Sequence, residues 1–235
     1  MSMLPILMYH NVGEKGRYLN VSVQGLVRQC RLLRMLRFKA KTLSELAGHL
    51  ETGELPPRTV VFTFDDALMG VHAHAHPVLS RFGWRATVFV VSQRLGRDTD
   101  WAPKHRHRVM GEHQLQELLD AGWEVGAHTR THPYLSRLRP EDAWQEIALC
   151  REELSRLTGT EVTSFCYPYG DLNEPIVRMV RDAGYCLACT VQKGLVSPDT
   201  DHYLLPRVHV AYSDGASGLV YRLWRAWRRS ERGTA

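Results

Sequence analysis

The sequence predicts an α/β fold built from repeated β/α units, and three observations support this prediction. Apolar segments rich in β-branched residues alternate with helical patterns along the chain. Four helical patterns end in a glycine just before the next apolar segment, at Gly83, Gly122, Gly159 and Gly184. Glycine tolerates the left-handed conformation that closes a helix, so this repeated order indicates a mostly parallel sheet. A chain of 235 residues with 44 % hydrophobic residues can also form one large core.

Seven apolar segments are expected to be strands: 5–9, 59–64, 86–91, 123–127, 162–167, 186–191 and, with the weakest pattern, 204–210. Helical patterns lie near 23–36, 70–82, 112–121, 140–158 and 173–183. Such a sheet either stays open or closes into a barrel. In both arrangements the active site lies at the carboxyl ends of the strands. We therefore expect reactive side chains where a strand ends and its loop begins.

The charge and composition exclude several classes of protein. The net charge is +5, and residues 218–235 contribute +4 of it through five arginines and Glu231, which leaves a nearly neutral body. Such a body argues against a nucleic-acid groove. The first residues lack the basic leader of a signal peptide, so the default expectation is a cytoplasmic protein. Five cysteines do not indicate a disulfide scaffold, and Cys186 and Cys189 are expected to be buried in a strand.

Two adjacent carboxylates, Asp65 and Asp66, directly follow the apolar segment in "VVFTFDDAL". Neighbouring residues of a strand point to opposite faces, so the two aspartates can perform different tasks. Two clustered acids repel each other unless a cation is near. The alternative is that one of them only caps a helix.

Two histidines, His128 and His132, follow the segment "WEVGA" in "HTRTH". They could meet on one face if the chain turns helically after the strand. Two histidines and one carboxylate form a common metal-binding set in hydrolases. The alternative is two surface histidines.

A second histidine cluster, "HAHAH", contains His72, His74 and His76 within a helical pattern rather than at a strand end. Only His72 and His76 would share a helix face. We expect a solvated helix face here and no physiological metal site.

A third strand end carries the turn Pro168-Tyr169-Gly170 in "SFCYPYGD". Proline and glycine favour a tight turn, which can present a backbone N–H to an oxyanion. Alone, this signal is weak.

Taken together, "TFDD", "HTRTH" and "YPYG" in this order resemble the polysaccharide deacetylases of carbohydrate esterase family 4. The opening "PILMYHNV", the block "ELLDAGWEVGAHTRTHPYLS" and the ending "LLPRVHV" extend the resemblance over residues 5–210. The aromatic-Pro-Tyr-Gly turn is similar to the branch that acts on poly-N-acetylglucosamine and related glycans.

The resemblance implies a distorted (β/α) barrel with about seven parallel strands and a divalent metal, usually zinc. It implies hydrolysis of the acetamide of an N-acetylated amino sugar, with release of acetate. Carried over position by position, it makes Asp66, His128 and His132 the metal ligands. Asp65 matches the catalytic base, and the backbone N–H of Tyr169 matches the group that faces the oxyanion.

The sequence departs from the family pattern at three places. Ala67 replaces the usual glycine after the paired aspartates, and Cys166 stands where many members have an arginine that steadies the base. We expect Arg207 to take over that task. The late histidine motif is matched only loosely, so His209 is the candidate acid. His10, at the end of the first strand, is a second candidate and could line the substrate cleft.

Other functions stay open at this point. A catalytically inactive relative could bind glycans without turnover, and a deformylase of lipid-linked sugars would use the same scaffold. An assay of acetate release would separate these alternatives.

The carboxyl-terminal segment 218–235 is predicted to be a basic amphipathic helix that follows a catalytic domain over residues 1–217. On a helix, one arc contains the apolar residues Leu219, Val220, Leu223, Trp224 and Trp227. The opposite arc contains Arg222, Arg225, Arg228, Arg229 and Arg232. This pattern is typical of a helix lying on an anionic membrane, which predicts peripheral contact through residues 218–232 at the inner membrane face and a lipid-linked amino sugar as substrate. The alternative is that the apolar arc packs on the barrel.

Overall fold

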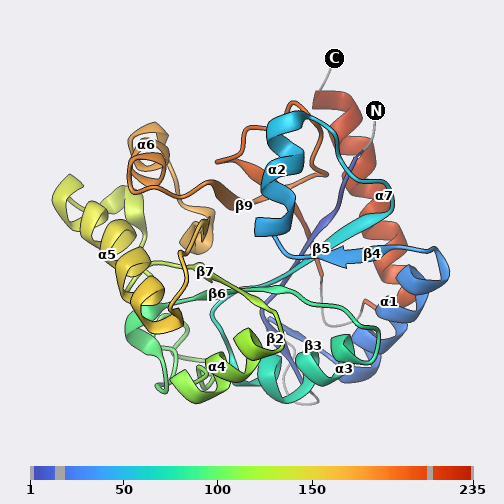
Figure 1. Ribbon diagram of the computed structural model, residues 1–235, viewed down its shortest axis with the longest axis horizontal. Helices are drawn as coiled ribbons and strands as arrows, with labels where there is room; N and C mark the ends of the chain where they lie inside the picture. Colours follow the sequence, from blue (N-terminus) through green and yellow to red (C-terminus); the bar gives the residue numbers. More distant parts are fainter. Residues whose placement is uncertain (1–2, 14–18, 211–213, 234–235) are drawn as a thin grey trace.

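Seven parallel strands close into a barrel in the computed structural model, which describes residues 3–13, 19–210 and 214–233 (Figure 1). In ring order they are β1 (Ile6–Tyr9), β10 (Leu205–His209), β9 (Leu187–Lys193), β8 (Ser164–Cys166), β7 (Glu124–Ala127), β6 (Thr87–Val90) and β5 (Thr59–Phe64). The ring closes because β1 pairs with both β10 and β5. The predicted distorted barrel is therefore confirmed, and all seven predicted strands belong to it.

Helices surround the strands (Figure 1). They are α1 (Val23–Met35), α3 (His76–Ser80), α4 (Glu112–Asp120), α5 (Pro140–Thr158), α6 (Glu174–Asp182) and α7 (Ala216–Gly233). Gly83, Gly122, Gly159 and Gly184 all have left-handed backbone angles, with φ between 66° and 86°. These four glycines therefore follow the ends of helices, as the sequence predicts.

Several short elements were not predicted. A strand β4 (Lys39–Lys41) pairs with residues 59–61 of β5, whereas β6 pairs with residues 63–64 on the same edge. The next helix, α2 (Ser44–Thr52), begins where Glu124 accepts a hydrogen bond from the Ser44 N–H at 2.8 Å. The short strands β2 (Asn11–Val12) and β3 (Asn20–Val21) pair with each other outside the barrel.

The barrel interior is apolar at the amino ends of the strands and polar at their carboxyl ends. Ile6, Val61 and Phe89 belong to an inner cluster that also contains Leu46 and Leu50 of α2. Side chains alternate along a strand, so Thr63 and Asp65 of β5 and its loop face inward above Val61. The same alternation brings the ends of β1, β7, β8 and β10 into one polar layer.

Two details differ from the expectations. Cys189 is buried in β9, but Cys186 is exposed because it precedes the strand. Helix α7 buries Leu219 and Ala226 against the barrel, while Val220, Trp224 and Trp227 of the predicted apolar arc remain 42–51 % exposed. No helix within the described ranges is long and apolar enough to cross a membrane.

Candidate active site

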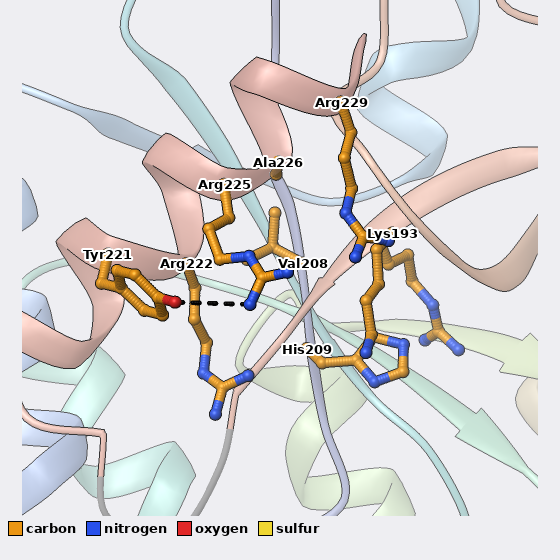
Figure 2. A pocket seen from close by; sticks show the side chains of 9 residues that line it. Lys193, Val208, His209, Tyr221, Arg222, Arg225, Ala226 and Arg229 are labelled. Atoms are coloured by element: carbon orange, nitrogen blue, oxygen red, sulfur yellow. Dashed lines mark hydrogen bonds between the residues drawn. The ribbon is translucent and has the colours of Figure 1, made fainter. Parts of the chain in front are cut away.

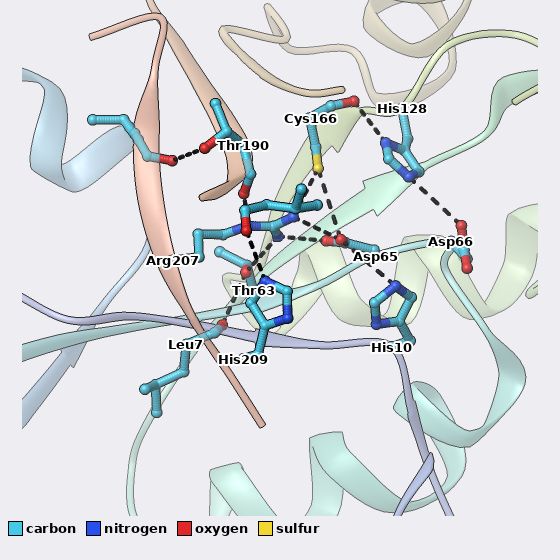
Figure 3. Close-up of polar contacts among 12 residues, drawn as sticks. Leu7, His10, Thr63, Asp65, Asp66, His128, Cys166, Thr190, Arg207 and His209 are labelled. Carbon is cyan, nitrogen blue, oxygen red and sulfur yellow. Dashed lines mark hydrogen bonds and ion pairs between the residues drawn. The ribbon is translucent and has the colours of Figure 1, made fainter. Parts of the chain in front are cut away.

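Asp66, His128 and His132 lie together at the carboxyl end of the barrel, and all three are buried. Figure 3 shows Asp66 and His128 of this set facing each other. Asp66 Oδ1 lies 3.6 Å from His128 Nε2 and 3.3 Å from His132 Nε2. The rings of His128 and His132 are 4.9 Å apart and nearly perpendicular. The structure thus brings together the three residues that the sequence assigns to the metal.

The backbone, and not a helix, makes these side chains converge. The two histidines meet without the helical turn that the sequence analysis considered, because residues 128–134 form an irregular loop in which Thr129 and His132 have φ values of 65° and 67°. The Thr129 hydroxyl accepts a hydrogen bond from the His132 N–H at 3.0 Å. Asp66 and Ala67 are also left-handed, with φ values of 69° and 50°. The usual glycine of the family would relieve this strain at Ala67, since glycine has no Cβ.

Surrounding side chains hold the loop and the two rings in place. The His128 Nδ1 atom lies 2.7 Å from the Cys166 carbonyl, so the Nδ1–H donates there and Nε2 faces Asp66. Glu146 of α5 accepts hydrogen bonds from the N–H groups of Arg130 and Thr131 at 2.8 and 2.9 Å. No sequence pattern points to Glu146, because its carboxylate reaches the loop from a helix face.

Aromatic rings enclose His132. Trp101 stacks on its imidazole with ring centroids 4.3 Å apart, and Tyr169 meets it edge-on at 4.5 Å. Tyr134 stacks on Tyr169 at 4.0 Å. Trp101 and Tyr134 are contributors that the sequence analysis did not select. Tyr134 lies within the recognised block, whereas Trp101 comes from a long loop without a local motif.

Asp65 forms a bidentate ion pair with Arg207, with N–O distances of 2.7 and 2.8 Å (Figure 3). Arg207 is completely buried and also donates to the carbonyl of Thr190 and the hydroxyl of Thr63. Burial alone raises the pKa of Asp65, but the charge and hydrogen bonds of Arg207 outweigh it and hold the pKa well below its usual range. Asp65 is therefore a carboxylate at neutral pH.

Asp66 has the opposite electrostatic environment. Burial, followed by the neighbouring charge of Asp65, raises the pKa of Asp66 to about 8. Its Oδ1 atom is buried without a hydrogen-bond partner among the described residues. Burial lowers the pKa of both His128 and His132, so both rings are neutral.

The donor set fits a bound cation. Donor atoms bound at 2.0–2.1 Å to one tetrahedral zinc ion lie about 3.3–3.4 Å apart, and the spacings of 3.3 and 3.6 Å around Asp66 Oδ1 are close to this. A second grouping of possible ligands contains Asp65, His128 and Cys166. Arg207 donates to both Asp65 and Cys166, so a positive charge already occupies that position.

The remaining predicted residues border this centre. His10 Nε2 lies 3.9 Å from Asp65 Oδ2, and burial lowers the pKa of His10 to about 4. His209 Nε2 is 2.9 Å from the Val191 carbonyl and is half-buried, which lowers its pKa. Tyr169 has a left-handed φ of 59° in the turn Pro168–Gly170. The Tyr169 ring from this turn meets the His132 ring at 4.5 Å.

The "HAHAH" histidines lie on the outside of the barrel. They occupy a π-helical turn, Val71–Ala75, and the start of α3. His72 forms an ion pair with Glu117 of α4, and the His76 ring meets Trp123 edge-on at 5.8 Å. His74 is exposed.

Comparisons with known proteins agree with this fold. The family model described as polysaccharide deacetylase matches residues 52–188. The protein YxkH of Bacillus subtilis is 29 % identical over 219 residues, which cover 93 % of this chain and 74 % of YxkH. The poly-beta-1,6-N-acetyl-D-glucosamine N-deacetylase of Staphylococcus epidermidis is 26 % identical over 201 residues, covering 82 % and 68 % of the two chains.

Solved structures share the fold over almost the whole chain. IcaB from Ammonifex degensii superposes with a TM-score of 0.84 at 24 % identity, covering 94 % of this chain and 97 % of IcaB. The Streptococcus pyogenes deacetylase PplD gives a TM-score of 0.83 at 21 % identity, covering 94 % and 98 %. Given the match of the family model to more than half of its residues, the chain belongs to the polysaccharide deacetylase family and is a hydrolase acting on carbon–nitrogen bonds.

Proposed function

We propose that this protein is a zinc-dependent N-deacetylase that hydrolyses the acetamide of an N-acetylated amino sugar in a glycan or lipid-linked saccharide. One observation carries the proposal: the buried set Asp66, His128 and His132 lies beside the ion pair of Asp65 and Arg207. The relative in Staphylococcus epidermidis is named for removing acetyl groups from poly-beta-1,6-N-acetyl-D-glucosamine. This supports a β-linked N-acetylglucosamine polymer as the first substrate to test.

Asp66, His128 and His132 would hold the metal. One carboxylate and two imidazoles form a set that zinc takes in hydrolases, with positions left for water and substrate. A bound divalent metal would polarise the amide carbonyl and lower the pKa of water to about 7. The Cys166 carbonyl keeps His128 in the tautomer whose Nε2 is free to bind.

Asp65 would accept the proton of the attacking water. A general base works best when its pKa is near the working pH, and Arg207 lowers the pKa of Asp65 below that optimum. The same ion pair keeps Asp65 ionised and fixes its orientation. We propose that this is the role of Arg207, in place of the arginine that the family usually has at position 166.

The departing amine needs a proton, and His10 and His209 are the candidates. His10 lies within 3.9 Å of Asp65, whereas the imidazole of His209 hydrogen-bonds to Val191. The Tyr169 N–H would stabilise the oxyanion, with a contribution of about 3 kcal/mol for one such donor. Trp101, Tyr134 and Tyr169 form apolar walls around His132 where a sugar ring could rest.

Acetate release tests this function. The purified chain, loaded separately with Zn²⁺, Mn²⁺ and Co²⁺, is incubated with β-1,6-linked N-acetylglucosamine oligomers and, as a comparison, with an N-formylated sugar. Acetate from the oligomers that disappears on chelation is the expected result. Turnover of the formyl substrate alone identifies a deformylase, and no turnover of either with any metal contradicts the proposal.

We further propose peripheral membrane contact through residues 218–232 at the inner membrane face of a cytoplasmic protein. Val220, Trp224 and Trp227 form an exposed apolar ridge on α7, and Arg228 lies over the Trp224 ring at 5.5 Å. Aromatic and basic residues on one exposed surface suit the boundary of an anionic bilayer. Sedimentation with anionic vesicles tests this: Trp224→Ala/Trp227→Ala should stay in the supernatant when the unmodified chain pellets. Equal pelleting of both contradicts membrane contact through α7.

A further inference from the structure

A cavity of about 250 Å³ lies between α7 and the ends of β9 and β10 (Figure 2). Five basic residues line it: Lys193, Arg207, Arg222, Arg225 and Arg229, of which Arg207 is paired with Asp65. Figure 2 shows Arg225 and Arg229 reaching from α7 towards Lys193 and His209. None of the lining residues is an acid.

Most of this positive charge is uncompensated. Arg222 is paired with Asp214, and Arg225 donates a hydrogen bond to the Tyr221 hydroxyl at 3.3 Å. Across the described part of the chain, Lys193, Arg225 and Arg229 have no carboxylate within ion-pair distance. Three cations facing one cavity repel each other, so an anion that enters the cavity lowers this repulsion.

The size and donors of the cavity select the class of anion. Pockets for drug-sized ligands have volumes of roughly 300–1,000 Å³, and this cavity, at about 250 Å³, is smaller. Guanidinium groups bind phosphate oxygens through paired N–H donors, and lysine adds a point charge. The lining therefore suits a phosphate group better than a neutral sugar.

The cavity adjoins the candidate active site through β10. Arg207 and His209 both belong to its lining, and Arg207 is the residue that pairs with Asp65. A strand rises about 3.3 Å per residue, so His209 stands about 7 Å beyond Arg207 along β10. A phosphate in the cavity could therefore belong to the same molecule whose acetamide reaches the metal ligands.

We propose that this cavity binds a phosphate or pyrophosphate group carried by the substrate, so that the enzyme prefers a phosphate-linked amino sugar. The assignment of this phosphate to the substrate rests on the proposed function, whereas anion binding by the cavity does not. Phosphate at Arg225, Arg229 and Lys193 would anchor the saccharide while Asp65 and the metal ligands act on its acetamide.

Calorimetric titration of the full-length chain with glucose 1-phosphate, which has no acetamide, measures the site without turnover. Glucose and glucuronate serve as neutral and carboxylate comparisons. Arg225→Gln/Arg229→Gln should weaken glucose 1-phosphate binding at least about tenfold, as expected for the loss of charge-assisted hydrogen bonds. Lys193→Gln, from the opposite wall, should weaken it as well.

Arg31→Gln/Arg81→Gln removes the same charge from exposed positions outside the cavity and should leave binding unchanged. Equal losses in this control, equal binding of glucuronate, or no binding by the unmodified chain overturns the proposal. A further outcome would also overturn the proposal. If the unmodified chain binds phosphatidylglycerol vesicles but not glucose 1-phosphate, and Arg225→Gln/Arg229→Gln loses the vesicle binding, the cavity binds lipid headgroups.

Kinetics separate this proposal from the proposed function. Arg225→Gln/Arg229→Gln should raise the KM for N-acetylglucosamine 1-phosphate and leave the KM for a neutral oligomer unchanged. Glucose 1-phosphate binding without acetate release from any sugar contradicts the deacetylase function and leaves the anion site standing. Acetate release with no preference for the phosphorylated sugar contradicts the substrate preference and leaves the deacetylase standing.

Discussion

Two histidine clusters with the same i, i+4 spacing lie in different environments in this fold. His128 and His132 are buried at the carboxyl end of β7 and converge on Asp66. His72 and His76 lie on a helical segment outside the barrel, and the partner of His72 is the partly exposed Glu117. The first pair faces the polar end of the barrel interior, whereas the second faces solvent and neighbouring helices.

The difference shows that position in the barrel, more than histidine density, determines where metal chemistry can occur. Left-handed residues at Asp66, Ala67, Thr129 and His132 cluster around the buried pair. Such conformations cost about 1–3 kcal/mol each and persist only where the surroundings enforce them. The helical segment of "HAHAH" has no left-handed residue, since its backbone follows ordinary helical geometry.

The largest expected effect comes from removing a histidine of the buried cluster. His128→Ala or His132→Ala should lose bound metal and reduce acetate release to background, by more than the roughly 10–100-fold cost of losing an outer partner of a metal ligand. Metal analysis of the purified variants and the acetate assay measure both effects.

The matched control replaces His72, His74 and His76 together with glutamine, and it should retain metal content and activity. If the triple variant is metal-free and inactive while His128→Ala is not, the assignment of the two clusters is reversed.

A second prediction separates the two aspartates. Asp65→Asn should retain the metal but reduce kcat by about 10²–10⁴-fold, the usual contribution of a general base. Asp66→Asn should instead lose metal affinity, because it replaces a charged ligand by a neutral one. Metal content and kcat are measured on both variants. Equal metal loss in the two variants would contradict the assignment of Asp65 as the base and Asp66 as the metal ligand.

Sequence patterns located the strands, and the resemblance supplied the barrel and the residues that meet at its carboxyl end. Alternating strands, helix-ending glycines and strand-end motifs are local signals, and they located all seven barrel strands. The expectation that Arg207 steadies Asp65 came from the resemblance, because many family members have an arginine where this chain has Cys166, and Arg207 does pair with Asp65.

What the sequence did not provide depends on distant contacts. Trp101 stacks on His132 from a loop with no motif, and Glu146 holds the histidine loop from the face of α5. The cavity beside α7 requires Lys193 and Arg229 to meet across two elements. Helical periodicity grouped Leu219 with Trp224, yet tertiary packing buried only the former.

A third prediction concerns pH. The pKa of metal-free Asp66 is raised to about 8 in the folded protein, whereas an aspartate of the unfolded chain has a pKa of about 3.9. The protonated carboxyl therefore stabilises the metal-free fold fully below the unfolded pKa, and this stabilisation is lost as the pH rises towards 8. The metal needs the ionised form, so zinc affinity should rise about 50-fold between pH 6 and pH 8. The increase in Tm with saturating zinc measures this.

The control for pH is Asp65→Asn, which removes the neighbouring negative charge and should shift the rise in zinc affinity to lower pH. An affinity that is flat from pH 6 to pH 8 in the unmodified chain contradicts the raised pKa of Asp66.

The smallest expected effect compares one histidine from each cluster in the metal-free protein. His72→Gln should lower the free energy of unfolding by at most about 1 kcal/mol, because its pair with Glu117 is partly exposed to solvent. His128→Gln should cost about 1–3 kcal/mol, because it leaves the buried Cys166 carbonyl without its donor. Urea denaturation of both variants after chelation measures the difference. Equal costs would mean that burial of His128 contributes nothing to the metal-free fold, and the contrast between the two clusters would then rest on metal binding alone.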